Sequence, residues 1–149
     1  MRAICALLLV LLGTPKGEFL PPDLIKPGMR GFGLTVFRGG KVDTFKVEAL
    51  GVLKNWAPKM DLILVRLSGG PDGVLRKAGV IAGMSGSPVF LEGKLVGAVA
   101  YGWTFSKEPI CGVTPIGAML EVARKPSDVS NALPDDKGLA PIATPLWLS

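Results

Sequence analysis

A serine set between glycines, just before an apolar segment, is the residue in this sequence best suited to nucleophilic chemistry. Residues 83–88 read Gly-Met-Ser-Gly-Ser-Pro, which places Ser85 on a tight turn that leads directly into a strand. Such a turn exposes the hydroxyl and leaves nearby backbone N–H groups free to stabilise the oxyanion formed during acyl transfer. We therefore expect Ser85 to be a nucleophile, with the N–H groups of Gly83 and Ser85 as its oxyanion donors. The alternative is that serine occurs here only because it tolerates tight turns.

A serine nucleophile needs a general base, and the sequence contains no histidine. Asp61, which directly precedes an apolar strand, is the candidate for the catalytic acid. Asp72 lies in the segment Ser-Gly-Gly-Pro-Asp-Gly and is better explained as a turn residue. Lys94 and Lys107 would have to be buried to act as bases, and their sequence surroundings are typical of exposed positions.

Cysteine and histidine usage argues against metal or thiol chemistry. Cys111 is the only cysteine outside the first 17 residues, so we expect it to be a small buried apolar side chain. The chain has no CxxC motif and no cluster of histidine and cysteine with metal-ligand spacing. We therefore predict no bound metal and no organic cofactor.

The composition favours one small domain built mainly from β-strands. A chain of 149 residues is the size of one domain, and its 20 glycines and 13 prolines are residues that helix interiors exclude. The formal net charge is +5, but the basic residues are scattered singly along the chain and form no stripe. We therefore expect no nucleic acid partner.

The first 17 residues are predicted to be a signal peptide. Met1 and Arg2 give a positive start, residues 3–12 are uninterruptedly apolar, and Gly-Thr-Pro ends the run. About ten apolar residues are too few for a stable membrane-spanning helix, and no later stretch is long enough. We expect export to the periplasm or the exterior, with no stable membrane span in the mature chain. Retention of residues 3–12 as an uncleaved anchor stays open.

Apolar patterning divides the remaining chain into a β domain over residues 18–124 and a polar tail over residues 125–149, whose end reads as the opening of a further strand. A loop is expected at residues 55–59, and one helix at 116–124, where the spacing of Met119 and Leu120 places both in the core. The expected strands cover residues 31–37, 42–52, 61–67, 88–91, 94–101 and 110–114.

These motifs resemble a known family. Gly-Met-Ser-Gly-Ser-Pro is similar to the Gly-x-Ser-Gly-(Gly/Ser)-Pro signature of chymotrypsin-like serine peptidases. The segments GMSGSPVF, GKLVGAVAYG, SKEPI and VTPIGAML resemble the SpoIVB-type peptidases, and PGMRGFGLTVFRGG and FKVEALGVL resemble the amino-terminal part of their longer bacterial relatives. The resemblance implies a mainly β, partial chymotrypsin-like (trypsin-like) barrel with one short helix near its carboxyl-terminal end. An open half-barrel exposes strand edges, so we expect marginal stability or association.

The resemblance also implies roles for individual residues. Ser85 matches the nucleophile, Gly83 matches the oxyanion-turn glycine, and Ala100, Tyr101 and Gly102 match the strand that pairs with an extended substrate. In the longer relatives a Phe-Gly-His-Pro motif follows the serine, so a segment downstream of residue 149 is expected to supply the histidine.

Two functions stay open at this point. The first is an exported serine endopeptidase, or its nucleophile-bearing fragment, which hydrolyses peptide bonds through an acyl-enzyme on Ser85. The second is a histidine-free, non-catalytic β module that binds extended peptides. In both, the partner is a polypeptide.

Overall fold

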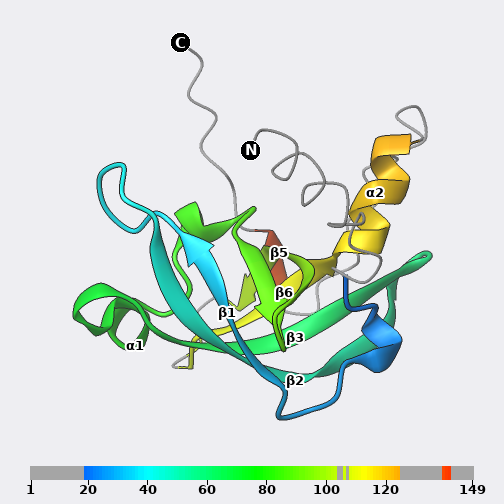
Figure 1. Cartoon of the computed structure of the whole chain (residues 1–149), viewed down its shortest axis with the longest axis horizontal. Coiled ribbons are helices and arrows are strands. Elements are labelled where there is room, and N and C mark those ends of the chain that lie inside the picture. Colours follow the sequence, from blue (N-terminus) through cyan, green and yellow to red (C-terminus); the bar gives the residue numbers. More distant parts are fainter. Residues whose placement is uncertain (1–18, 104–105, 107, 125–138, 142–149) are drawn as a thin grey trace, which may run out of the picture.

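Six antiparallel strands close into a barrel in the computed structural model of the chain, which describes residues 19–103, 106, 108–124 and 139–141 (Figure 1). Around the barrel the order is β1, β2, β3, β6, β5 and β4, and β4 pairs again with β1. A seventh strand pairs with the outer half of β5. The strands are β1 (Arg30–Thr35), β2 (Asp43–Ala57), β3 (Met60–Gly69), β4 (Pro88–Leu91), β5 (Lys94–Trp103), β6 (Ile110–Pro115) and β7 (Leu139–Pro141).

Alternation of apolar side chains along the strands fills the barrel interior. In β2, Phe45, Val47 and Ala49 are buried while Lys46 and Glu48 between them face outward, as the two-residue period of a strand requires. In β3 both Leu62 and neighbouring Ile63 are fully buried. The rest of the interior is lined mainly by the β-branched and leucine side chains of Val65, Leu67, Val89, Leu91, Val96, Val99 and Val113.

Glycines allow the strands of this narrow barrel to come close together. Gly31 of β1 lies opposite Leu91 of β4, and a Cβ added at Gly31 would lie 1.9 Å from the backbone oxygen of Phe90. Gly97 of β5 is in the same situation, because its added Cβ would lie 1.9 Å from the backbone oxygen of Thr114 on β6. Neither position therefore has room for a side chain. Gly31 lies where β1 contacts β4, and Gly97 lies where β5 contacts β6.

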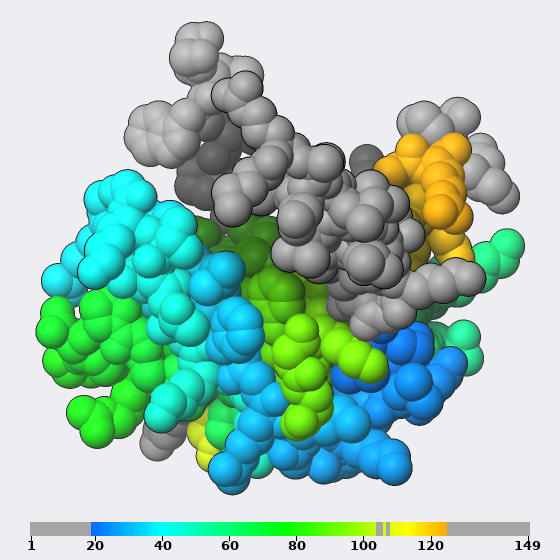
Figure 2. Space-filling view, in the orientation of Figure 1, coloured from blue at the N-terminus to red at the C-terminus, as the bar shows by residue number. Residues whose placement is uncertain are grey.

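The expected mainly β barrel with a short helix near its carboxyl-terminal end is confirmed, and it is consistent with a partial chymotrypsin-like barrel. The helix α2 spans Ile116–Arg124, as predicted. The placement of Met119 and Leu120 in the core is wrong, because the two side chains are 40% and 38% exposed. Figure 2 shows α2, in orange, standing out from the body of the molecule.

Three further expectations are corrected by the structure. The predicted loop at residues 55–59 is largely strand, because β2 continues to Ala57 before the turn into β3. A second helix, α1 (Val74–Ala78), was not expected, since its five residues are too few to show helical periodicity. The six-strand barrel is closed by β4–β5 pairing and is not the open half-barrel that was expected, although β7 has one edge without a partner strand among the described residues. Association of the chain stays a prediction.

The predicted signal peptide and most of the predicted polar tail lie outside the described residues. Within the described part of the chain, no helix is long and apolar enough to cross a membrane.

We predict that Gly31→Ala lowers the free energy of unfolding by at least about 2 kcal/mol, since the new methyl group would overlap the backbone of β4. Urea denaturation measures the change. Gly40→Ala is the matched control, because nothing lies within 4 Å of a Cβ built there and its φ is not positive. Equal stability of the two variants would contradict the close approach of β1 to β4.

Candidate active site

Ser85 lies at the end of a single 3-10 turn formed by Ala82–Met84, immediately before β4. Met84 is buried and fixes the turn to the barrel interior, whereas Ser85 itself is half-buried. The next residue has a φ of +83°, a left-handed conformation that favours glycine, and Gly86 occupies it. The Gly-Met-Ser-Gly pattern is thus explained by the turn that it forms.

Four backbone hydrogen bonds hold this turn. Within it, the Met84 N–H donates to the Ile81 oxygen at 2.9 Å and the Ser87 N–H donates to the Met84 oxygen at 3.0 Å. Two more bonds attach the turn to β5: the Gly86 N–H donates to the Val99 oxygen at 2.8 Å, and the Val99 N–H donates to the Ser87 oxygen at 3.0 Å.

The N–H groups of Gly83 and Ser85 take no part in these four bonds. These are the two groups that the sequence assigns to an oxyanion site. Gly83 is exposed, and a Cβ built on it would meet no atom within 4 Å, so the space beside the turn is open. The turn is therefore anchored through Met84, Gly86 and Ser87, and none of these four bonds uses either proposed donor.

A buried side-chain hydrogen bond ties the turn to β1 as well. The Ser87 hydroxyl donates to Thr35 Oγ1 at 2.8 Å, and both residues are only 7% exposed. Sequence reasoning missed this pair, because the partners are 52 residues apart and nothing in the sequence links Thr35 to the motif that contains Ser87. Thr35 ends β1, so the bond fixes the Ser85 turn to the end of the strand that pairs with β4.

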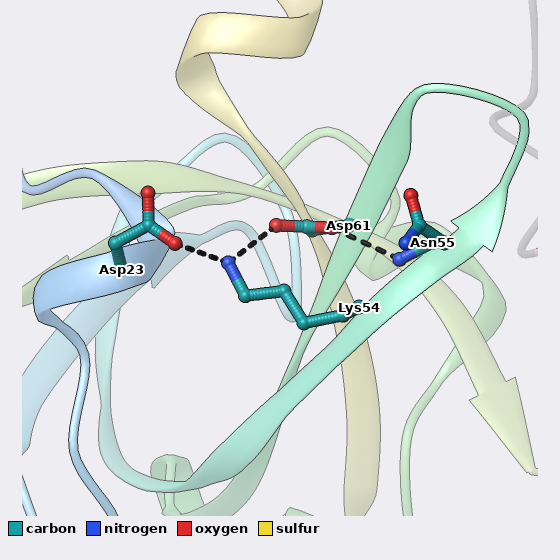
Figure 3. A network of polar contacts seen from close by, with 4 residues as sticks. All are labelled: Asp23, Lys54, Asn55 and Asp61. Carbon is teal, nitrogen blue, oxygen red and sulfur yellow. Dashed lines mark hydrogen bonds and ion pairs between the residues drawn. The ribbon is translucent and has the colours of Figure 1, made fainter.

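The structure does not bring Asp61 to Ser85. Asp61 lies at the start of β3, and the strands β6 and β5 stand between β3 and the Ser85 turn. Its carboxylate accepts hydrogen bonds from Lys54 Nζ at 2.8 Å and from the Asn55 N–H at 3.0 Å, while Lys54 also pairs with Asp23 (Figure 3). Asp61 therefore stabilises the β2–β3 hairpin, and its hydrogen bonds go to Lys54 and Asn55 rather than to the Ser85 turn. Its part in catalysis stays a prediction.

The hydrogen bonds of this hairpin shift the pKa values of Asp61 and Lys54. The hydrogen bond from Lys54, followed by that from the Asn55 N–H, holds the pKa of Asp61 below its ordinary value of 3.8. The hydrogen bond to Asp23 and then that to Asp61 raise the pKa of Lys54 above 10.5. Asp61 and Lys54 are consequently both charged at neutral pH.

The structure also shows the surroundings of two of the three other catalytic candidates, Asp72 and Lys94. Asp72 lies in the turn before α1 with a φ of +54° and forms an exposed ion pair with Arg38 at 3.5 Å. Lys94 is exposed beside the β4–β5 turn, and Lys107 lies outside the described residues. Among the described residues, Ser85 forms no side-chain hydrogen bond with any candidate base.

Cys111 is fully buried on β6, in agreement with the expectation of an apolar role. Burial raises the pKa of its thiol to about 12, so the reactive thiolate is not formed at neutral pH. In the described part of the chain, no three residues of the metal-ligating types come together.

The residues matched to the substrate strand lie on β5, next to the Ser85 turn. The edge of β5 pairs with β4 as far as Ala98, and Val99 bonds with the turn. Beyond this point Tyr101 and Gly102 lie opposite Pro141 and Ala140 of β7. The ring of Tyr101 also packs edge-on against buried Trp56 of β2, with ring centroids 6.4 Å apart.

We predict that Asp61→Asn lowers the free energy of unfolding by about 1 kcal/mol at pH 7, because asparagine keeps an acceptor but loses the charge facing Lys54. The folded pKa of Asp61 is lowered, so its contribution is complete above the unfolded value near 4 and is lost as pH falls through the folded value. Urea denaturation at pH 7 and pH 3 measures both. A difference between variant and wild type that stays constant with pH would contradict the assignment.

Most of the sequence matches one known protein family. The family described as SpoIVB peptidase S55 matches residues 24–120, which is more than half of the chain. The match includes the Ser85 turn and all six barrel strands. No curated protein and no solved structure matches the chain. The resemblance drawn from the sequence is confirmed, and the chain belongs to the SpoIVB peptidase family.

Proposed function

We propose that this chain carries the nucleophile of an exported serine endopeptidase and that Ser85 forms the acyl-enzyme. The observation that carries the proposal is the Ser85 turn, which is fixed to β5 by two hydrogen bonds while the N–H groups of Gly83 and Ser85 take no part in holding it. Membership of a serine peptidase family supports the same role.

The chemistry assigned to the turn is nucleophilic acyl transfer. Ser85 Oγ attacks the carbonyl carbon of a peptide bond as its proton passes to a base, and the carbonyl oxygen becomes an oxyanion facing the Gly83 and Ser85 N–H groups. The C–N bond then breaks, the amine leaves with the proton, and water releases the acyl group from Ser85. Loss of one oxyanion donor typically lowers kcat by about a hundredfold to a thousandfold.

The general base in this proposal comes from outside these 149 residues. None of the 149 residues is a histidine, and Asp61 is held by Lys54 and Asn55. A histidine of a segment that follows residue 149 would complete the site. A positioned general base contributes about a hundredfold to ten-thousandfold in rate, so Ser85 alone would react slowly.

The second candidate function is a non-catalytic module that binds extended peptides. The observation that favours it is the lack of histidine, together with a β5 edge that accepts a paired strand beyond Val99. Under this alternative Ser85 would be a turn residue, and its hydroxyl would have no chemical role.

Export is the second part of the proposal. Its support is the positively charged start, the apolar residues 3–12 and the Gly-Thr-Pro break. Amino-terminal sequencing of the protein secreted by its native host tests it. A mature terminus near residue 18 would support cleavage, and an intact Met1 terminus would support the uncleaved anchor.

We predict that a fluorophosphonate probe labels Ser85 slowly and that added imidazole accelerates the labelling, because free imidazole supplies the missing base. Intact-protein mass spectrometry follows the reaction, and peptide mapping locates the adduct. Ser85→Ala should abolish labelling. Ser68→Ala is the matched control, since Ser68 is an exposed serine at the far end of β3 and its loss should change nothing.

The outcomes separate the two candidate functions. Labelling of Ser85 with no turnover of peptides would show a competent oxyanion site that lacks its base. Absence of labelling with and without imidazole, combined with equal peptide binding by wild type and Ser85→Ala, would refute the nucleophile assignment and support the peptide-binding module.

A further inference from the structure

The edge of β5 is occupied by the chain's own β7. Figure 1 shows β7, in red, beside β5, and the register places Leu139 opposite Trp103, Ala140 opposite Gly102 and Pro141 opposite Tyr101. The pairing is antiparallel. It covers two of the three residues, Tyr101 and Gly102, that are matched to the substrate strand.

Along this edge, β4 and β7 lie end to end. β4 pairs with β5 as far as Ala98, the Ser85 turn bonds with Val99, and β7 begins its pairing at Tyr101. Because β7 runs antiparallel to β5, its carboxyl end, Pro141, is the end nearer Val99 and the Ser85 turn. A strand in this position therefore directs its carboxyl side toward the proposed nucleophile.

We propose that the segment Leu139–Pro141 is an internal ligand of the peptide-binding edge of β5, and that an external peptide binds only by displacing it. The inference deepens the proposed function, because it assigns regulation to the same site, but displacement itself does not require the Ser85 hydroxyl. Strand addition of this kind obtains its affinity from main-chain hydrogen bonds, which any extended peptide can supply.

The pairing of β7 with β5 is short, so a longer peptide can displace it. The strand has only three residues, Pro141 has no N–H, and successive N–H groups of a strand point to opposite sides, so β7 offers the edge of β5 at most one backbone donor. A longer peptide with a donor at every position can form a more complete ladder. The edge that it would meet, Tyr101–Trp103, carries no charge, and the internal strand reads Leu-Ala-Pro. The external ligand is accordingly an extended, uncharged, largely apolar peptide segment.

A reversible disulfide tests the occupancy directly. Directly opposed antiparallel residues have Cα separations compatible with a disulfide, so Trp103→Cys/Leu139→Cys should cross-link β7 to β5. Both cysteines are introduced into the full chain with Cys5→Ser and Ser85→Ala, and native Cys111 is buried. The probe is a fluorescein-labelled peptide that copies residues 136–143 (DKGLAPIA), followed by fluorescence anisotropy.

We predict that the oxidised variant does not bind the probe and that dithiothreitol restores binding to the same protein. In a second variant, Ala140→Pro removes the N–H of the central residue of β7, which lies opposite Gly102, and weakens the pairing of β7 with β5. Probe binding should tighten by at least about tenfold, the gain expected if β7 covers the edge about nine-tenths of the time. A probe with proline at the matching alanine (DKGLPPIA) is the control and should bind more weakly to every variant.

Three results would overturn the inference: failure of the two cysteines to cross-link in a protein with wild-type circular dichroism, equal probe binding before and after reduction, or no tightening with Ala140→Pro. All three measurements use proteins that carry Ser85→Ala. The inference can therefore fail while fluorophosphonate labelling of Ser85 succeeds, and labelling can fail while displacement is observed.

Discussion

Two hydrogen bonds between the Ser85 turn and Val99 of β5 hold the part of the molecule on which the proposed function depends. The Gly86 N–H and the Ser87 oxygen bond with the same residue of β5, so the turn continues the β4–β5 ladder past the end of β4. This ladder closes the barrel, and it leaves the N–H groups of Gly83 and Ser85 outside the bonds that shape the turn. Closure of the barrel and presentation of the serine thus share one cause.

The same arrangement fits the proposal that the chain holds one half of a hydrolytic site. The proposed nucleophile and its proposed donors need only a local turn, and the barrel supports that turn through Val99 and through the buried bond between Ser87 and Thr35. A base must approach from a separate element, and the acidic candidate Asp61 is engaged in the β2–β3 hairpin. Beyond Val99, β5 offers a strand-pairing edge, which β7 takes in this structure.

Local patterns in the sequence predicted much of this fold. The Glu92-Gly93 turn has positive φ at both residues, α2 spans the residues predicted from helical spacing, and the Ser85 segment forms the expected tight turn. Long-range relations were not predictable in this way. The bond between Ser87 and Thr35, the closure of β4 onto β1 and the separation of Asp61 from Ser85 all depend on which strands become neighbours, and a single sequence carries no direct signal for that choice.

Amide hydrogen exchange, followed residue by residue by NMR, tests the central claim most directly. If the ladder at Val99 holds the turn, the amides of Gly86, Ser87 and Val99 exchange slowly, while those of Gly83 and Ser85 exchange much faster. Rapid exchange at Gly86 and Val99, or slow exchange at Ser85, would contradict a rigid turn with free oxyanion donors.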